Sequence, residues 1–319
     1  LVTGGSGFIG SHVLMELAER GYQVISLDLA GPSAVVKDVV DEIAFVTCDV
    51  TDTDALNRAM ESIAPDRIVH LVSLLGRECR TDPGSAIRVN IEGTINVLEA
   101  ATRIGADRVI TASSVSAYGS ASADRARLDE SVVQQPDSLY GLTKYAVGRL
   151  GSCYRREYGL SVAALEPVHG IGPGRNTGNV EDTFVIQAAV SGSAITVPGG
   201  ARPYELIHVR DTARAFVQAV TADALGHDRY LVGTGETISM DEIVSLLDDR
   251  YDGTDITVAD SVADTFPEHP PTDSRRLRTD VDWAPRYSPA EAVEACATWL
   301  EENPEQWSFD PDDVPRIGA

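Results

Sequence analysis

The sequence has 319 residues, of which 43% are hydrophobic and 24% are charged, and its formal net charge is −23. These proportions are typical of a globular protein, and the length suits one large α/β domain or two coupled domains. The acidity argues against a nucleic-acid-binding protein, which needs a basic surface, and against a protein that binds anionic membranes. No stretch of the sequence approaches the roughly 18 consecutive apolar residues of a membrane-spanning helix.

The basic residues are almost all arginine: among the 26 basic residues, the only lysines are Lys37 and Lys144. Strong acidity with so little lysine predicts a protein from a high-salt cytoplasm, where a hydrated acidic surface stays soluble. A GC-rich coding bias would give the same composition, and both explanations stay open. The scattered cysteines and histidines lack metal-ligand spacing, which predicts free thiols in a reducing compartment and no metal site.

In the first half of the chain, short apolar strands alternate with helical patterns. This alternation predicts a parallel, doubly wound α/β sheet, and the apolar strands fit burial on both faces of the sheet. The expected strands are 1–3, 22–28, 43–48, 67–72, 108–112 and 162–165, and the expected helices follow the first glycines and cover 55–60, 87–101 and 139–158.

The pattern changes beyond Pro167. Residues 170–179 read as a glycine-rich polar loop, 264–271 as a proline-rich acidic segment, and 283–300 as a final turn and helix. We expect residues 1–166 to form a first domain and 167–319 to form mainly a smaller, substrate-binding portion. Segments near 205–235, with apolar runs at 207–209 and 230–232, are expected to return to the first sheet.

Gly4, Gly7 and Gly10 lie between the first strand and a helix, and this context predicts a dinucleotide site. Glycines let the backbone approach a pyrophosphate, and the helix N-terminus offers unpaired N–H groups to it. Asp28 ends the next strand, where a carboxylate binds ribose hydroxyls and repels a 2′-phosphate, so NAD is favoured over NADP. Asp49 ends the third strand, within expected reach of the adenine amino group. A glycine turn that only packs, and acidic residues that only cap strands, are the alternatives.

Tyr140 and Lys144 stand one helical turn apart, and we expect them to share a helix face. A phenol with a pKa of about 10 is a poor base, and a neighbouring ammonium is expected to lower that pKa. Lys144 is also expected to reach the nicotinamide-ribose hydroxyls. Ser113 and Ser114 follow the fifth strand, at the sheet edge where substrates bind, so a hydroxyl there can bind the reacting oxygen. An exposed helix pair and a turn-capping serine are the alternatives.

These motifs together resemble the extended short-chain dehydrogenase/reductases, in the NAD-dependent epimerase/dehydratase group, and most of all its UDP-glucose 4-epimerase-like members. The resemblance implies a Rossmann-type first domain, a catalytic set of Ser114, Tyr140 and Lys144, tightly bound NAD and a homodimer formed through two helices. The matching segments are 3–10, Asp28, 49–50, 70–73, 90–94, 113–119, 140–144, 172–174, 207–211 and 283–288. The residues implied to bind NAD are Gly4, Gly7, Phe8, Ile9, Gly10, Asp28, Asp49, Val50, Leu71, Val72, Ser73, Ser113, Tyr140, Lys144 and Pro167.

The departures from the family pattern bear on the substrate. Val115 and Ser116 stand where the family's dehydratases carry an Asp-Glu pair and its decarboxylases a Glu, so the resemblance favours epimerisation. Tyr204 stands where nucleotide-sugar enzymes have a diphosphate-binding Arg, His169 replaces an Asn, and Glu166 replaces an Arg. The candidate substrate-binding residues are Ser114, Arg77, His169, Arg175, Arg202 and Tyr204, with Arg80 as a further member of an anion clamp.

The leading hypothesis is an NAD-dependent epimerase of a sugar, and specifically of a nucleotide sugar. The second is a net dehydrogenase of a small hydroxy compound such as a uronate, an aldose or a threonine-like amino alcohol. The third is a non-catalytic NAD-binding regulator, and the Ser114, Tyr140 and Lys144 set counts against it because a scaffold needs no proton relay. In each case we expect a cytoplasmic protein with a small polar ligand.

Overall fold

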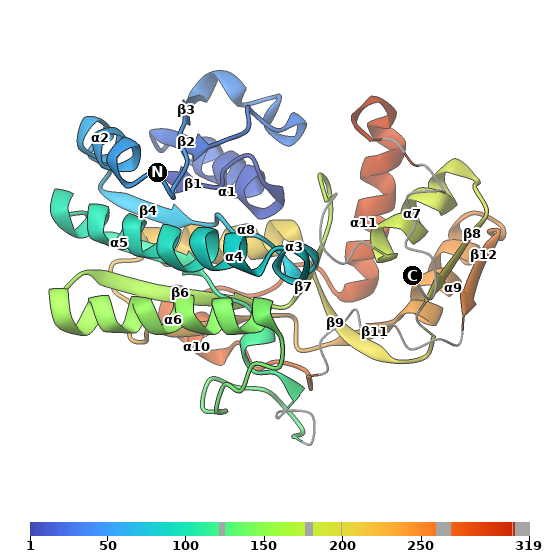
Figure 1. Cartoon of the computed structure of the whole chain (residues 1–319). Helices are drawn as coiled ribbons and strands as arrows, with labels where there is room; N and C mark the ends of the chain where they lie inside the picture. Colours follow the sequence, from blue (N-terminus) through green and yellow to red (C-terminus); the bar gives the residue numbers. More distant parts are fainter. Residues whose placement is uncertain (121–124, 176–180, 199, 260–268, 308, 310–319) are drawn as a thin grey trace.

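The structure is a computed structural model that describes residues 1–120, 125–175, 181–198, 200–259, 269–307 and 309. Its centre is a seven-stranded sheet in the order β10-β6-β5-β4-β1-β2-β3, and every neighbouring pair is parallel (Figure 1). The predicted doubly wound parallel sheet is therefore confirmed. The strands are β1 (Val2–Thr3), β2 (Val24–Asp28), β3 (Ile43–Thr47), β4 (Arg67–His70), β5 (Arg108–Ala112), β6 (Ser161–Pro167) and β10 (Arg229–Val232).

Helices cover both faces of this sheet. On one face α1 (Phe8–Glu19) packs against α8 (Val209–Thr221), and on the other α2 (Thr53–Ile63), α5 (Gly93–Ile104) and α6 (Leu139–Tyr158) lie side by side (Figure 1). Each face has its own apolar core, so the strands are buried from both sides, as their apolar sequences require. The shorter helices are α3 (Gly76–Thr81), α4 (Pro83–Ile87) and α10 (Arg275–Val281), and short 3-10 turns occur at Ala34–Val36, Val40–Glu42, Val115–Ala117 and Pro304–Gln306.

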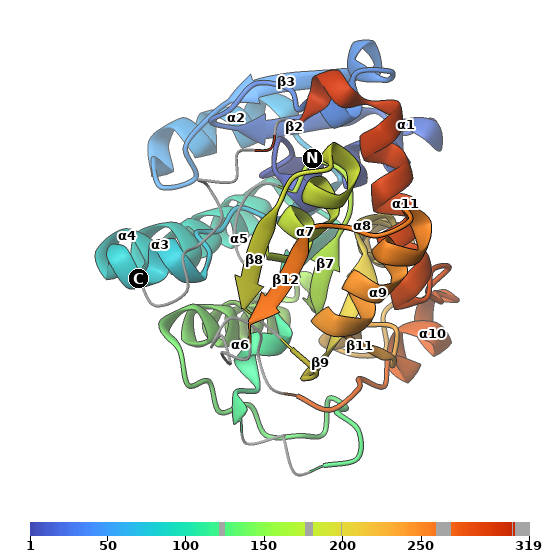
Figure 2. The same ribbon diagram turned by 90° about the vertical axis from the view of Figure 1, so that its right-hand side faces the viewer.

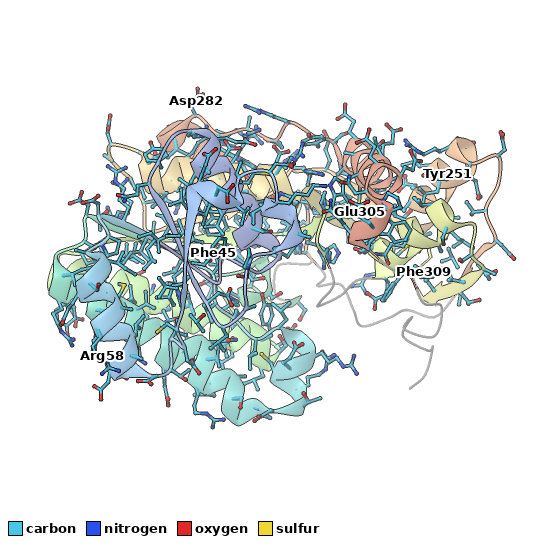
Figure 3. All side chains as sticks on the ribbon, turned by 90° about the horizontal axis from the view of Figure 1, so that it is seen from above. Phe45, Arg58, Tyr251, Asp282, Glu305 and Phe309 are labelled. Carbon is cyan, nitrogen blue, oxygen red and sulfur yellow. The ribbon has the colours of Figure 1, made fainter. Side chains whose placement is uncertain are left out.

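The second portion of the chain forms a separate layer with a third apolar core. Figure 2 faces this portion, and Figure 3 shows from above that Tyr251 and Phe309 lie in it, whereas Phe45 and Arg58 lie in the first part. Its elements are β7 (His169–Ile171), β9 (Pro203–His208) and β11 (Thr237–Ser239) in one small sheet, β8 (Ile195–Pro198) and β12 (Ile256–Ala259) in another, and the helices α7 (Glu181–Ser191), α9 (Met240–Arg250) and α11 (Pro289–Glu302).

One prediction about the second half is wrong. Residues 207–209 do not return to the main sheet, because β9 pairs with β7 and β11, and Val209 already begins α8. The chain returns instead through helix α8, which packs on β4, β5 and α1, and then through β10, which pairs with β6 as predicted for 230–232. The predicted polar loop and acidic segment fall partly on 176–180 and 260–268, which lie outside the described residues.

Local signals in the sequence account for the helix ends. Ser138 caps α6 by accepting a hydrogen bond from the Gly141 N–H, and Gly159 ends it in the left-handed conformation. The helix predicted at 87–101 is longer and less regular: α4 leads through a π-helical turn at Arg88–Glu92 into α5. Within the described parts of the chain, no helix is long and apolar enough to cross a membrane.

Candidate active site

The glycine-rich turn between β1 and α1 brings backbone against backbone. Gly4 has a φ of +73°, and the Gly7 N–H donates to its carbonyl over 3.2 Å. A Cβ on Gly10 would lie 2.0 Å from the Gly4 oxygen, which no side chain tolerates. Gly10 is therefore required for α1 to start this close to the strand, and the turn can present its N–H groups to a ligand.

The start of α1 fits an anionic ligand. Gly7 caps this helix without a side-chain hydrogen bond, and the first turn contains no acidic residue, so the positive end of the helix dipole is not compensated. Both Asp28 oxygens are held at the end of β2, one by the Ser6 N–H and the other by the Ala30 N–H, each over 3.0 Å. A carboxylate has about four acceptor sites, so Asp28 keeps capacity for ribose hydroxyls. These residues fit NAD.

The other predicted cofactor residues line the same edge of the sheet. The Leu71 N–H donates to the Thr3 carbonyl over 3.0 Å, and a Cβ on Gly4 would lie 2.8 Å from the Val72 nitrogen. The segment 71–73 therefore runs directly against the glycine turn. Pro167 ends β6, and Phe8 packs between Gly170, whose Cβ position lies 3.5 Å from the ring, and the Arg175 guanidinium, 5.5 Å from the ring centre.

Asp49 and Val50 are held by their own turn. One Asp49 oxygen accepts from both the N–H and the hydroxyl of Thr51, each over 2.8 Å. The Val50 side chain packs on the α5 backbone, because a Cβ on Gly93 would lie 2.8 Å from it. This geometry fits the alternative in which Asp49 only caps the end of its strand. The contact of Asp49 with adenine stays a prediction.

The structure brings the predicted catalytic residues together beyond the ends of β5 and β6. The Lys144 ammonium donates to the Ala112 carbonyl over 3.0 Å and lies 5.6 Å from the centre of the Tyr140 ring. The Ser113 hydroxyl donates to the Lys144 carbonyl over 2.9 Å, which ties the strand end to α6. Ser114 is buried, and its oxygen accepts from the Ser116 N–H over 3.1 Å.

The electrostatics of the pair differ from the prediction. Burial raises the pKa of Tyr140 to about 12, and the hydrogen bond with Ser114 only partly opposes that rise. Burial also lowers the pKa of Lys144 to about 8. The expectation that Lys144 lowers the pKa of the phenol therefore does not hold in this structure, since the amine is turned to the Ala112 carbonyl and burial disfavours both charged forms.

Asn90 is a site residue to which the sequence analysis gave no role. It lies in the π-helical turn, and its amide accepts from the Leu74 N–H over 2.7 Å and donates to the Leu74 carbonyl over 2.9 Å. The same amide nitrogen donates to the Thr143 hydroxyl over 3.0 Å. Asn90 thus links the segment after Ser73 to the residue before Lys144. Its place in the family-like segment 90–94 was the available signal.

Three of the candidate substrate residues gather in the second portion. The His169 Nε2 lies 2.7 Å from an Asp182 oxygen, and the His169 and Tyr204 rings meet edge to face with centres 5.7 Å apart. Burial lowers the pKa of His169, and the Arg175 charge acts in the same direction. Arg175 is therefore near the cluster. Asp182, on α7, was not foreseen from the sequence.

The remaining arginines lie differently. Arg77 and Arg80 are exposed on α3, which packs against α6, and Arg202 is half-buried just before β9. Their role as an anion clamp stays a prediction. Over the residues that the structure describes, no cluster of three or more His, Cys, Asp and Glu side chains could hold a metal ion.

Comparison with known proteins decides the family. The model of the NAD dependent epimerase/dehydratase family matches residues 1–233. The chain belongs to this family. Among its relatives, a UDP-glucose 4-epimerase of Mycolicibacterium smegmatis is 30% identical over 311 residues, with 92% of this chain and 95% of the relative covered. A dTDP-glucose 4,6-dehydratase of Streptomyces antibioticus is 27% identical, with 96% and 93% covered.

Solved structures share the fold of this chain. The UDP-glucose 4-epimerase of Thermus thermophilus in complex with NAD superposes with a TM-score of 0.83 at 25% identity, covering 93% of this chain and 97% of that one. The family is NAD dependent, and the cofactor predicted from the glycine turn and Asp28 agrees with it.

Proposed function

We propose that this family member is an NAD-dependent sugar epimerase, with a nucleotide sugar as its substrate, that works by transient oxidation. The observation that carries the proposal is the meeting of Ser114, Tyr140 and Lys144 at the carboxyl edge of the parallel sheet, the same edge that holds the glycine turn and Asp28. In open α/β sheets, ligands bind beyond this edge.

NAD would be held by the glycine turn, the N-terminus of α1 and Asp28. When bound, it supplies the acceptor and then the donor of the hydride, so the side chains of this chain have to move only a proton. Tyr140 is the proton-transfer group in the proposal. Its high pKa, about 12, keeps it protonated at neutral pH in the structure as it stands.

Ser114 and Lys144 support that transfer. Because the Ser114 oxygen already accepts from the Ser116 N–H, its proton remains for a bond to Tyr140 or to the reacting substrate oxygen. The Lys144 pKa, about 8, lets this amine carry a positive charge near neutral pH, and it would stabilise a phenolate once its ammonium turns from the Ala112 carbonyl toward the phenol oxygen.

The turn after Ser114 supports epimerisation over water elimination. These positions are a valine and a serine, so neither offers a carboxylate. Val115 is buried, and the Ser116 N–H donates to Ser114. Elimination of water requires an acid to protonate the departing hydroxyl. Epimerisation needs only redox and proton transfer.

A net dehydrogenase of a small hydroxy compound is the second candidate. Tyr204 is buried at the position where the family resemblance expects a diphosphate-binding arginine, and next to it His169 pairs with the Asp182 carboxylate. A carboxylate there repels a diphosphate, although Arg175 lies near it. This observation favours a substrate without a diphosphate.

A substrate screen separates these candidates. UDP-, GDP- and dTDP-sugars, free uronates and amino alcohols are each incubated with the enzyme, while NADH absorbance and epimer formation are followed. An epimerase converts a sugar without external NAD and accumulates no NADH, whereas a dehydrogenase accumulates NADH. If NAD binds and no compound reacts, the result favours the hypothesis of a non-catalytic NAD-binding regulator.

Further proposals concern the assembly and the setting. We propose a homodimer formed through α5 and α6, where α6 exposes 47% of Leu142 and 61% of Tyr158. Light scattering on the eluting protein tests it, and a monomer contradicts it. A cytoplasmic location, a high-salt setting and a division at residue 166/167 into a cofactor-binding and a substrate-binding domain also remain proposals.

A further inference from the structure

Glu166 is a fully buried carboxylate that the proposed chemistry does not use. It lies next to Pro167 at the end of β6, and its exposed fraction is 0%. Three donors from three separate segments converge on it. They are the Tyr118 hydroxyl at 2.7 Å, the Gln134 amide at 2.8 Å and the Arg229 guanidinium at 3.5 Å.

Along the chain, the first two donors lie between the catalytic residues Ser114 and Tyr140. Tyr118 is the residue that follows the 3-10 turn begun by Ser114, and Gln134 lies six residues before Tyr140. Within residues 125–133 of the segment between them, Leu128 forms an isolated bridge to Thr272. Glu166 therefore joins the chain just after Ser114 to the chain just before Tyr140.

The catalytic turn and α6 also touch directly, so their relative position matters. A Cβ on Gly141, the neighbour of Tyr140, would lie 2.4 Å from the Ser116 carbonyl oxygen. The two backbones are in close contact here, so any shift of the 114–118 turn also moves the first turn of α6. The hydrogen bond between Ser114 and Tyr140 depends on this same spacing.

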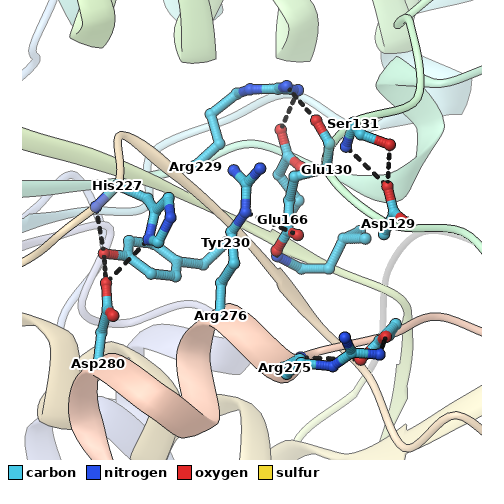
Figure 4. A network of polar contacts seen from close by, with 12 residues as sticks. Asp129, Glu130, Ser131, Glu166, His227, Arg229, Tyr230, Arg275, Arg276 and Asp280 are labelled. Carbon is cyan, nitrogen blue, oxygen red and sulfur yellow. Dashed lines mark hydrogen bonds and ion pairs between the residues drawn. The ribbon is translucent and has the colours of Figure 1, made fainter.

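Arg229 anchors the carboxylate to the edge strand β10. In Figure 4, dashed lines join the Arg229 guanidinium to Glu166 and to Glu130. Its guanidinium donates to the Glu130 carbonyl over 2.9 Å, while the Glu130 carboxylate accepts from the Leu231 N–H over 2.8 Å and pairs with Arg276 at 3.3 Å. The network thus ties Glu166, and the loop that carries Glu130, to the edge strand β10 and to Arg276 on α10.

We propose that Glu166 is a positioning residue for the proposed reaction: by holding Tyr118 and Gln134 on the β6–β10 edge, it sets the distance between Ser114 and Tyr140. The inference rests on the proposed function for its catalytic consequence, but not for the structural link itself. It assigns a role to a residue at which the sequence departs from the family pattern.

The ionised form of Glu166 is the form that positions Tyr118 and Gln134. Tyr118, Gln134 and Arg229 all donate to it, and a carboxylate accepts all three bonds without a competing proton. The charged groups that face it are Arg229 from β10 and Glu130 from the loop, beside the Tyr118 phenol and the neutral Gln134. Burial raises the pKa of Glu166 to about 7, so the positioning contacts should strengthen as pH rises through neutrality.

The test compares Glu166→Gln with a matched control, Glu205→Gln. Glu205 is also buried, and it accepts from Thr272 and Gly235 without contacting the 114–118 turn or Gln134. We expect Glu166→Gln to lower kcat by about tenfold to a hundredfold with KM within about twofold of the native value. We expect the native kcat to rise through pH 7, and this rise should be absent in Glu166→Gln and present in Glu205→Gln.

A second arm needs no substrate. Hydrogen exchange, read by mass spectrometry on the NAD-loaded protein, should become faster in residues 114–118 and 134–142 of Glu166→Gln, and not in those of Glu205→Gln. Tyr118→Phe removes one donor and should give a weaker form of both effects, which keeps the test valid if Glu166→Gln folds poorly.

Unchanged exchange in both segments would overturn the inference, and so would a fall in kcat no larger than that of Glu205→Gln. If the native protein turns over no sugar at all, the proposed function fails, and the exchange arm alone decides the positioning role.

Discussion

The stability of the protein should depend on pH through Glu166, and Glu166→Gln isolates that dependence. Burial raises the pKa of this carboxyl from 4.5 to about 7, against the attraction of Arg229. A raised pKa means that the folded protein holds the proton more tightly than the unfolded chain does. The protonated carboxyl therefore stabilises the fold below about pH 4.5, and this contribution is lost as the pH rises to about 7.

The structure gives the size of the effect. A pKa rise from 4.5 to about 7 corresponds to about 3 kcal/mol, because each pH unit is worth about 1.4 kcal/mol. Glu166 is fully buried, so solvent screening reduces this figure little. Glutamine has no proton to lose, and the variant should therefore lack this loss.

The measurement is urea unfolding of the native protein and of Glu166→Gln at several pH values between 4.5 and 8, at constant salt. The native protein should lose about 3 kcal/mol relative to the variant across this window. A difference that stays constant with pH would refute the reasoning. A native protein that gains stability relative to the variant would show that Arg229 outweighs burial.

Three further results are expected. Asp28→Ala should weaken NAD binding by about tenfold or more relative to NADP, because the ribose loses a charged acceptor, and an unchanged ratio of the two dissociation constants would place the ribose contact elsewhere. Gly10→Ala should prevent NAD binding or folding, since its Cβ would lie 2.0 Å from the Gly4 oxygen, and a variant that binds NAD normally would contradict the turn geometry. If the net charge of −23 reflects salt adaptation, the midpoint of thermal unfolding should rise in molar KCl, while an equal midpoint in dilute buffer favours coding bias.

The elements that were predictable from sequence are those specified by local signals. The expected helix at 139–158 matches α6, because Ser138 caps its start and Gly159 ends it, and both signals lie within a few residues of the boundary. The glycine turn and Asp28 were readable for the same reason. Tyr140 and Lys144 needed only helical spacing to be placed together.

The features that depend on long-range contacts were not predictable. The apolar run at 207–209 reads as a strand, but no local pattern says that β9 pairs with β7 and not with β6. The Glu166 contacts join residues far apart in sequence, and Asp182 gains its role only by meeting His169. The prediction for the Tyr140 pKa was wrong because the four-residue spacing to Lys144 indicates a neighbouring charge but gives no information on burial, which raises this pKa.

The central claim is that Tyr140 transfers the proton in an NAD-dependent reaction. The direct measurement is turnover of the best substrate by Tyr140→Phe, with NAD binding measured on the same sample and Tyr154→Phe, farther along α6, as the control. The account predicts a loss of at least about a hundredfold in kcat with NAD still bound, and native turnover in the control. Turnover by Tyr140→Phe at the native rate would contradict it.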